Sequence, residues 1–154
     1  MYHLNFLPLA EVKEYLKIEA DQTNEDALLI NQIAQACRYV ERSTGVMLYA
    51  RDLYFNVRGC TNVYQRPINT DVATLPNIEG TKKGLYTRFK SLDGSNQDFI
   101  LNVGTDTEVG YEDLKSVCVE MVELLYTGTA ESGVAEKGLS TLSLQILDEN
   151  KGFV

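Results

Sequence analysis

The stretch TNEDALLINQIAQACRYVERSTG, Thr23–Gly45, predicts one long amphipathic helix around which the rest of the chain is organised. Thr23 is the expected N-cap, Asp26 takes the place of a capping-box acid, and Gly45 is the expected left-handed residue at the helix end. No catalytic pattern is visible on this helix, so we interpret it as a packing element, which favours a structural protein over an enzyme. Its apolar residues recur at helical spacing on one face: Ile30, Ile33, Ala34, Cys37 and Val40.

The composition is that of a soluble globular protein with an acidic surface. The 154 residues carry 22 Asp and Glu against 14 Lys and Arg, a formal net charge of −8. This charge disfavours non-specific binding to nucleic acid or anionic lipid, but it suits a surface that DNA must pass without sticking. No run approaches the roughly 18 apolar residues of a membrane span, and the N-terminus lacks the pattern of a signal peptide. We therefore expect no membrane association.

Two further helices are predicted on either side of a β-rich middle. A short helix is expected at Leu9–Leu16, entered through Pro8, and a third helix at Tyr111–Tyr126. Residues 1–7 are expected to form an arm or a short strand. The predicted fold class is therefore α+β, a small helical bundle of three main helices with a β-hairpin-rich middle and an extended C-terminal tail.

The middle of the chain changes from helical to alternating periodicity after Gly45. Residues 46–58 alternate as a half-buried strand, and residues 63–66 are typical of a short return strand. Residues 85–89 and 99–103 alternate on either side of an Asp-Gly pair, which predicts a hairpin. Residues 69–84 contain a proline and few apolar side chains, so we expect a surface loop there.

The C-terminal part, 127–154, is predicted to be a linker and strand-like tail, separate from the main domain at 1–126. A strand after a flexible linker can add to a sheet edge of a partner or fold back on its own domain, and both alternatives stay open. Val119 and Val122 form a second apolar seam on the third helix, for which a neighbouring subunit is a natural cover. The predicted interface residues are Val119, Val122, Tyr126, Leu139, Leu142, Leu144, Ile146 and Phe153.

No catalytic, cofactor-binding or metal-ligating residue is predicted. His3 is the only histidine and lies in the N-terminal arm, so we interpret it as a surface residue. The cysteines at positions 37, 60 and 118 lack metal-binding spacing, and Cys60 is the one expected to be exposed. Two acidic clusters are explained by helix starts, where carboxylates are favoured; they are Asp21, Glu25 and Asp26, and Asp106, Glu108, Glu112 and Asp113.

The segment Leu9–Gly45 resembles the N-terminal region of the head–tail connector proteins of tailed phages, the small head-completion adaptors. Leu114–Tyr126 resembles the helix that this family has near its C-terminus, but Thr127-Gly128 stands where the family often has Asn-Arg-Glu. The residues that match in the N-terminal segment are Val12, Tyr15, Leu16, Asp26, Ala27, Leu28, Leu29, Ile33, Ala36, Tyr39, Val40, Glu41, Thr44 and Gly45.

The resemblance implies a non-enzymatic structural protein of the virion neck, made in the host cytoplasm. Members of the family form a homo-oligomeric ring of about a dozen subunits between the portal protein and the next neck or tail completion protein. Genomic DNA passes through the ring without specific binding, and an acidic wall would let it slide. The C-terminal segments of such adaptors commonly reach the portal, which would give residues 128–154 a role.

Two alternatives come from other classes of protein. The first is a small cytosolic interaction or regulatory module, dimeric through the third helix. The second is an enzyme whose site is built from carboxylates and tyrosines, which would need a concave pocket that gathers residues such as Asp106, Glu108 and Tyr111.

Overall fold

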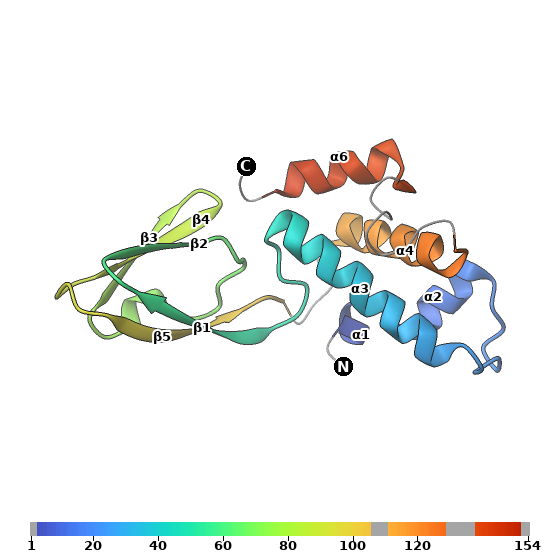
Figure 1. The fold of residues 1–154 in the computed structure, drawn as a ribbon, viewed down its shortest axis with the longest axis horizontal. Helices are drawn as coiled ribbons and strands as arrows, with labels where there is room; N and C mark the ends of the chain where they lie inside the picture. Colours follow the sequence, from blue (N-terminus) through green and yellow to red (C-terminus); the bar gives the residue numbers. More distant parts are fainter. Residues whose placement is uncertain (1–2, 106–110, 129–137, 152–154) are drawn as a thin grey trace.

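Helix α3, Asp26–Thr44, runs through the centre of a helical half, as the sequence predicts (Figure 1). Its inward face is fully buried at residues such as Leu29 and Val40. The helix ends at Gly45, whose φ of 77° is left-handed and whose N–H donates to the Glu41 carbonyl at 2.8 Å. The predicted position of the α3 C-terminus is therefore confirmed.

The N-cap expected at Thr23 is wrong. Glu25 occupies the cap position, and its side chain makes no capping hydrogen bond. Only the Thr23 backbone carbonyl takes part, accepting the Asp26 N–H at 3.2 Å in the turn before the helix. Instead, the buried Lys13 side chain orders this connection, because it donates to the Gln22 carbonyl at 2.7 Å and pairs with Asp26 at 2.5 Å.

The computed structural model describes residues 3–105, 111–128 and 138–151. Within these ranges the chain forms five helices and two small antiparallel sheets, so the predicted α+β class is confirmed. The predicted arm at 1–7 is instead a helical turn over residues 3–6, because Phe6 and Leu7 are buried against the bundle. Besides α3, the helices are α1 His3–Phe6, α2 Leu9–Leu16, α4 Glu112–Tyr126 and α6 Thr141–Asn150.

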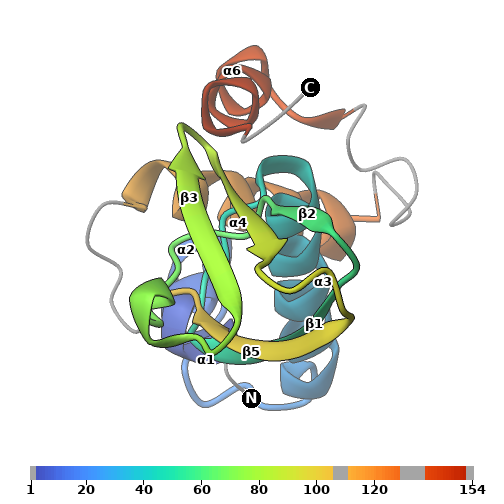
Figure 2. The ribbon, with the colours of Figure 1, turned by 90° about the vertical axis from the view of Figure 1, so that its left-hand side faces the viewer.

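The strands gather at one end of the helical half (Figures 1 and 2). β1 pairs with β5 in a two-stranded sheet, and β4 lies between β2 and β3 in a three-stranded sheet. Phe89 of β4 and Phe99 of β5 join the two sheets, with ring centroids 4.9 Å apart, so the strands share one core. The bounds are β1 Arg51–Val57, β2 Cys60–Val63, β3 Ile78–Lys83, β4 Tyr86–Ser91 and β5 Gln97–Val103.

The predicted strand pairings are wrong, although most strands lie where the alternation indicates. The strand that follows β1 does not pair with it, because β2 pairs with β4. The strands β4 and β5 do not form the expected hairpin with each other. Alternation shows which side of a strand is buried but not which strand lies beside it. The loop expected at 69–84 instead contains the 3₁₀ turn η1, Val72–Thr74, and the edge strand β3, where only Ile78 is buried.

The connection from β5 toward α4 passes very close to the connection from α3 to β1. Gly104 has a φ of 98°, and a Cβ placed there would lie 2.0 Å from the Tyr49 carbonyl oxygen. Only glycine allows this approach. The Gly104 N–H donates to the Pro67 carbonyl at 2.8 Å, which adds a second backbone contact at this crossing.

The C-terminal segment forms helix α6, so the predicted strand at 139–147 is wrong. Leu139, Ser143 and Leu147 recur every four residues and are buried, which is helical spacing. The Ser140 Oγ accepts the Ser143 N–H at 3.2 Å and caps the new helix. The apparent alternation arises because Leu142 and Leu144 lie on the outer side of this helix.

Candidate interaction surface

The start of α6 is held on α4 by one carboxylate. Glu120 accepts the Ser140 N–H at 2.5 Å and the Ser140 Oγ–H at 3.0 Å, and it also accepts a hydrogen bond from the Ser143 hydroxyl. A carboxylate at a helix N-terminus also interacts favourably with the positive end of the helix dipole. These three hydrogen bonds fix where α6 begins after the linker.

The other end of α6 is held by two polar contacts. The Arg66 guanidinium donates to the backbone carbonyl of Asn150, which is a favourable partner because helix C-termini carry unpaired carbonyls. The Asn150 side-chain amide donates to Asp113 Oδ2 at 3.2 Å. Arg66 and Asp113 come from the β half and from α4 respectively, so α6 contacts both halves of the molecule.

Two faces of α6 differ in their surroundings. The inner face buries Leu147 in the helical core, together with Leu139 just before the helix. The outer face exposes 65% of Leu142 and 42% of Leu144. Two leucines exposed on the same short helix are a candidate contact for another molecule.

The other predicted interface residues lie in different places. Val122 is fully buried in the chain's own helical core, so it needs no neighbouring subunit as a cover, while Val119 and Ile146 are partly buried there. Tyr126 donates its hydroxyl to Glu25 Oε2 at 2.6 Å, and this hydrogen bond raises the pKa of Tyr126. Phe153 lies outside the described residues. The predicted interface residues that the structure describes are therefore divided between the core and the surface.

The residues that anchor α6 were missed by the sequence analysis. Ser140 is a residue type that is favoured at helix N-caps, and this signal is present in the sequence. The roles of Glu120 and Arg66 could not have been inferred, because each depends on which surface α6 packs against.

The groups that might carry chemistry do not assemble into a reactive site among the described residues. His3 is partly buried, and its pKa is lowered by burial and by nearby Arg38. The buried thiols of Cys37 and Cys118 meet between α3 and α4, where their hydrogen bond and burial raise the pKa of Cys118. Cys60 is exposed, as predicted. Within the described ranges, no three potential metal ligands lie together.

The enzyme hypothesis needs a pocket that gathers carboxylates with Tyr111. Tyr111 lines a pocket of about 530 Å³ between the halves, together with Arg66 and Tyr86. Its one described carboxylate, Asp71, already accepts the Ala73 N–H at 3.1 Å. Asp106 and Glu108, which that hypothesis requires, lie outside the described residues.

The described helices include none with the length and apolar character needed to cross a bilayer.

Solved structures that share this fold come from gene transfer agent particles. One is a chain in the neck of an empty particle, computed with C6 symmetry; it matches with a TM-score of 0.70 and 16% identity, over 97% of this chain and 91% of that chain. A chain in the virion of the native particle matches with a TM-score of 0.65 and 15% identity, over the same shares. At these identities the likeness establishes the fold. No family model and no curated protein matches the sequence.

Proposed function

We propose that this chain is a structural protein of the neck of a phage-like particle, with no enzymatic activity. The observation that carries the proposal is the likeness to a neck chain over 97% of the sequence, at a TM-score of 0.70. Fold alone does not define function. The independent resemblance of Leu9–Gly45 to phage head–tail connectors supports the same assignment from the sequence.

Within the neck, we assign the chain the role of a head-to-tail connector. It forms a homo-oligomeric ring between the portal protein and the next neck or tail completion protein. The C6 symmetry with which the related neck was computed supports a ring, because subunits of a cyclic assembly repeat by rotation. The resemblance implies about twelve copies, and a ring of twelve is compatible with six-fold symmetry.

The net charge of −8 supports a passive role toward DNA. Phosphates find few cations on such a surface, so the DNA moves through the ring without specific binding.

We place the portal contact on the C-terminal segment 127–154, and within it on the outer face of α6. Leu142 and Leu144 are exposed there, while the anchors at Glu120 and Arg66 present the helix in one orientation. Val119, Tyr126 and Ile146 are partly buried, and we include them in the proposed interface.

The test is capture by the cognate portal protein, measured by light scattering after size exclusion and by negative-stain images. We expect the full chain to join the portal in a complex larger than either component. Deletion of 128–154, or the double substitution Leu142→Glu/Leu144→Glu, should abolish capture because charges replace the apolar contact. Leu85→Glu/Leu92→Glu is the matched control, since both leucines are exposed on the β half.

The outcomes distinguish the portal contact on α6, the connector role and the alternative interaction module. Equal capture of the Leu142→Glu/Leu144→Glu variant would remove α6 from the portal interface but keep the connector role. A stable dimer that ignores the portal would instead support the small interaction or regulatory module.

A further inference from the structure

A pocket rich in arginine lies where α3 ends and the chain turns toward β1. It has a volume of about 490 Å³, and its charged lining residues are Arg38, Glu41, Arg42 and Arg51. We call it the arginine pocket. Three guanidinium groups and one carboxylate line it, although acidic residues outnumber basic ones in the chain as a whole.

The single carboxylate of the arginine pocket is already occupied. Glu41 is buried, its Oε1 accepts the Leu48 N–H at 2.9 Å, and its Oε2 accepts Arg51 Nη2 at 2.7 Å. Arg38 and Arg42 are exposed one helical turn apart and have no acidic partner among the described residues. The pocket therefore retains a positive charge that its own carboxylate does not neutralise.

The third guanidinium group of the pocket belongs to Arg51 and is held by partners within the chain. Its Nη2 donates to Glu41 at 2.7 Å, and the group lies over the Tyr49 ring, 4.2 Å from the ring centroid. The cations that remain for an outside anion are therefore those of Arg38 and Arg42. Arginine favours carboxylates, which its planar group binds through two parallel hydrogen bonds.

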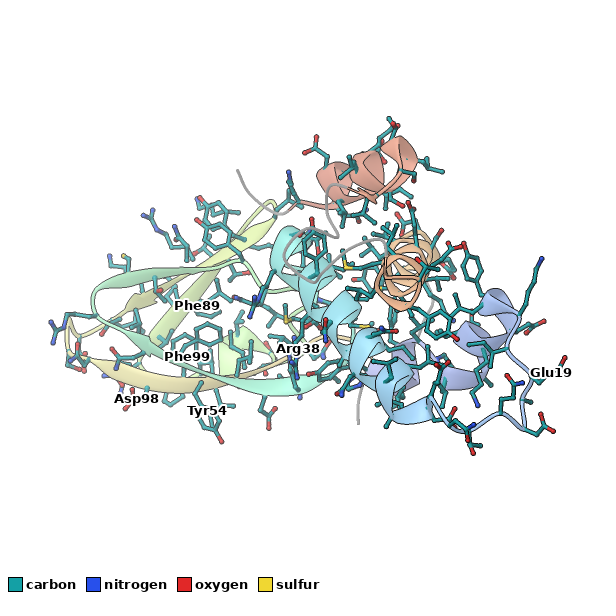
Figure 3. All side chains as sticks on the ribbon, turned by 45° about the vertical axis from the view of Figure 1, so that its right-hand side comes forward. Glu19, Arg38, Tyr54, Phe89, Asp98 and Phe99 are labelled. Carbon is teal, nitrogen blue, oxygen red and sulfur yellow. The ribbon has the colours of Figure 1, made fainter. Side chains whose placement is uncertain are left out.

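Exposed carboxylates lie at the opposite end of α3. Glu19 and Asp21 are exposed in the connection before the helix, here called the acidic loop, and neither makes an ion pair within the described ranges. Figure 3 shows Glu19 at the end of the helical half that is far from the strands and Arg38 close to them. A helix of 19 residues is about 28 Å long at 1.5 Å per residue, so one copy cannot join its own loop to its own pocket.

We propose that the arginine pocket binds the acidic loop, Glu19 and Asp21, of a second copy of this chain. Each copy then offers a cationic surface at one end of α3 and an anionic surface at the other. A contact between two different surfaces of the same chain is a head-to-tail contact. Repeated from subunit to subunit, it produces a closed ring when the rotations between neighbours add up to a full turn. The inference rests on the proposed ring and names the charges that set the register between its neighbours.

The experiment measures self-association of the full chain by sedimentation velocity, at low and at raised salt. Arg38→Glu/Arg42→Glu and Glu19→Lys/Asp21→Lys should each weaken association about tenfold or more, because like charges then face each other. Combining all four substitutions should restore association, since opposite charges meet again. Raised salt should weaken association of the unaltered chain.

Arg88→Glu/Lys90→Glu is the matched control, with the same charge change on exposed positions of β4. It should associate like the unaltered chain. If the variant with all four substitutions associates again, each of the two double variants must also fold. A misfolded chain would not be rescued by further substitutions.

Three results would overturn the inference: an unaltered chain that stays monomeric at every concentration and salt, association unchanged by Arg38→Glu/Arg42→Glu, or no recovery in the combined variant. Binding of duplex DNA that Arg38→Glu/Arg42→Glu abolishes would overturn it too, since the pocket would then serve phosphates. None of these results affects portal capture, on which the proposed neck function is judged separately.

Discussion

At the scale of single residues, Asp93 shows how one carboxylate can order a connection. Its Oδ1 accepts the Ser95 N–H at 2.9 Å, the Ser95 hydroxyl at 2.6 Å and the Ser91 hydroxyl at 3.1 Å. These bonds, above all those from Ser95, lower the pKa of Asp93 to about 2. They hold the connection that carries the chain from one sheet to the other.

We expect Asp93 to titrate near pH 2 in an NMR titration of the folded protein. Because its pKa is below the unfolded value, its hydrogen bonds contribute stability at neutral pH, and this contribution is lost as the pH falls through about 2. Ser95→Ala should raise the pKa toward 3.8, while Ser116→Ala on α4 should not change it. An unchanged pKa in Ser95→Ala would contradict this account.

At the scale of elements, the position of α6 depends on Glu120. We expect Glu120→Ala to lower the free energy of unfolding by about 1–3 kcal/mol, because the hydrogen bonds that its carboxylate accepts from Ser140 and Ser143 are lost. Hydrogen exchange should become faster selectively in residues 141–150. Glu79→Ala, at an exposed position of β3, is the control. Unchanged protection of α6 in Glu120→Ala would show that its buried leucines alone hold it.

Helices were more predictable from the sequence than strand pairings. The boundaries of α2 and α4 and the end of α3 follow from local spacing and from a glycine that permits a left-handed turn. Pairing is not local: β4 pairs with β2 and β3 and not with β5, and Phe89 and Phe99 pack between the two sheets. The α6 segment is short, so its apolar residues fit both the alternation of a strand and the spacing of a helix. Its packing against the helical core determines that it is a helix.

The candidate surfaces were predictable only in part. Leu142 and Leu144 were predicted as interface residues for the wrong reason, a strand, and the structure still leaves them exposed. In the sequence, Arg38 and Arg42 are basic residues scattered among acidic ones. The pocket that they line forms only when Arg51 and the buried Glu41 meet behind them, and sequence spacing cannot show this.

At the scale of the whole molecule, two separate cores give the chain its shape. One core belongs to the helices and the other to the strands, and the close crossing beside Gly104 lies where the strands begin and end. The arginine pocket lies near this junction, while the acidic loop and the outer face of α6 lie on the helical half. A subunit with distinct surfaces can contact neighbours within a ring and a different protein beside it.

The most direct test of the central claim is a cryo-EM reconstruction of the purified particles that contain this chain, with particles from a deletion strain as the comparison. We expect the chain to form a ring between the portal and the tail, with both α6 and the arginine pocket at protein contacts. Particles without the chain should remain filled or empty heads that lack tails. Complete tailed particles without the chain, or a neck with no density for it, would contradict the account.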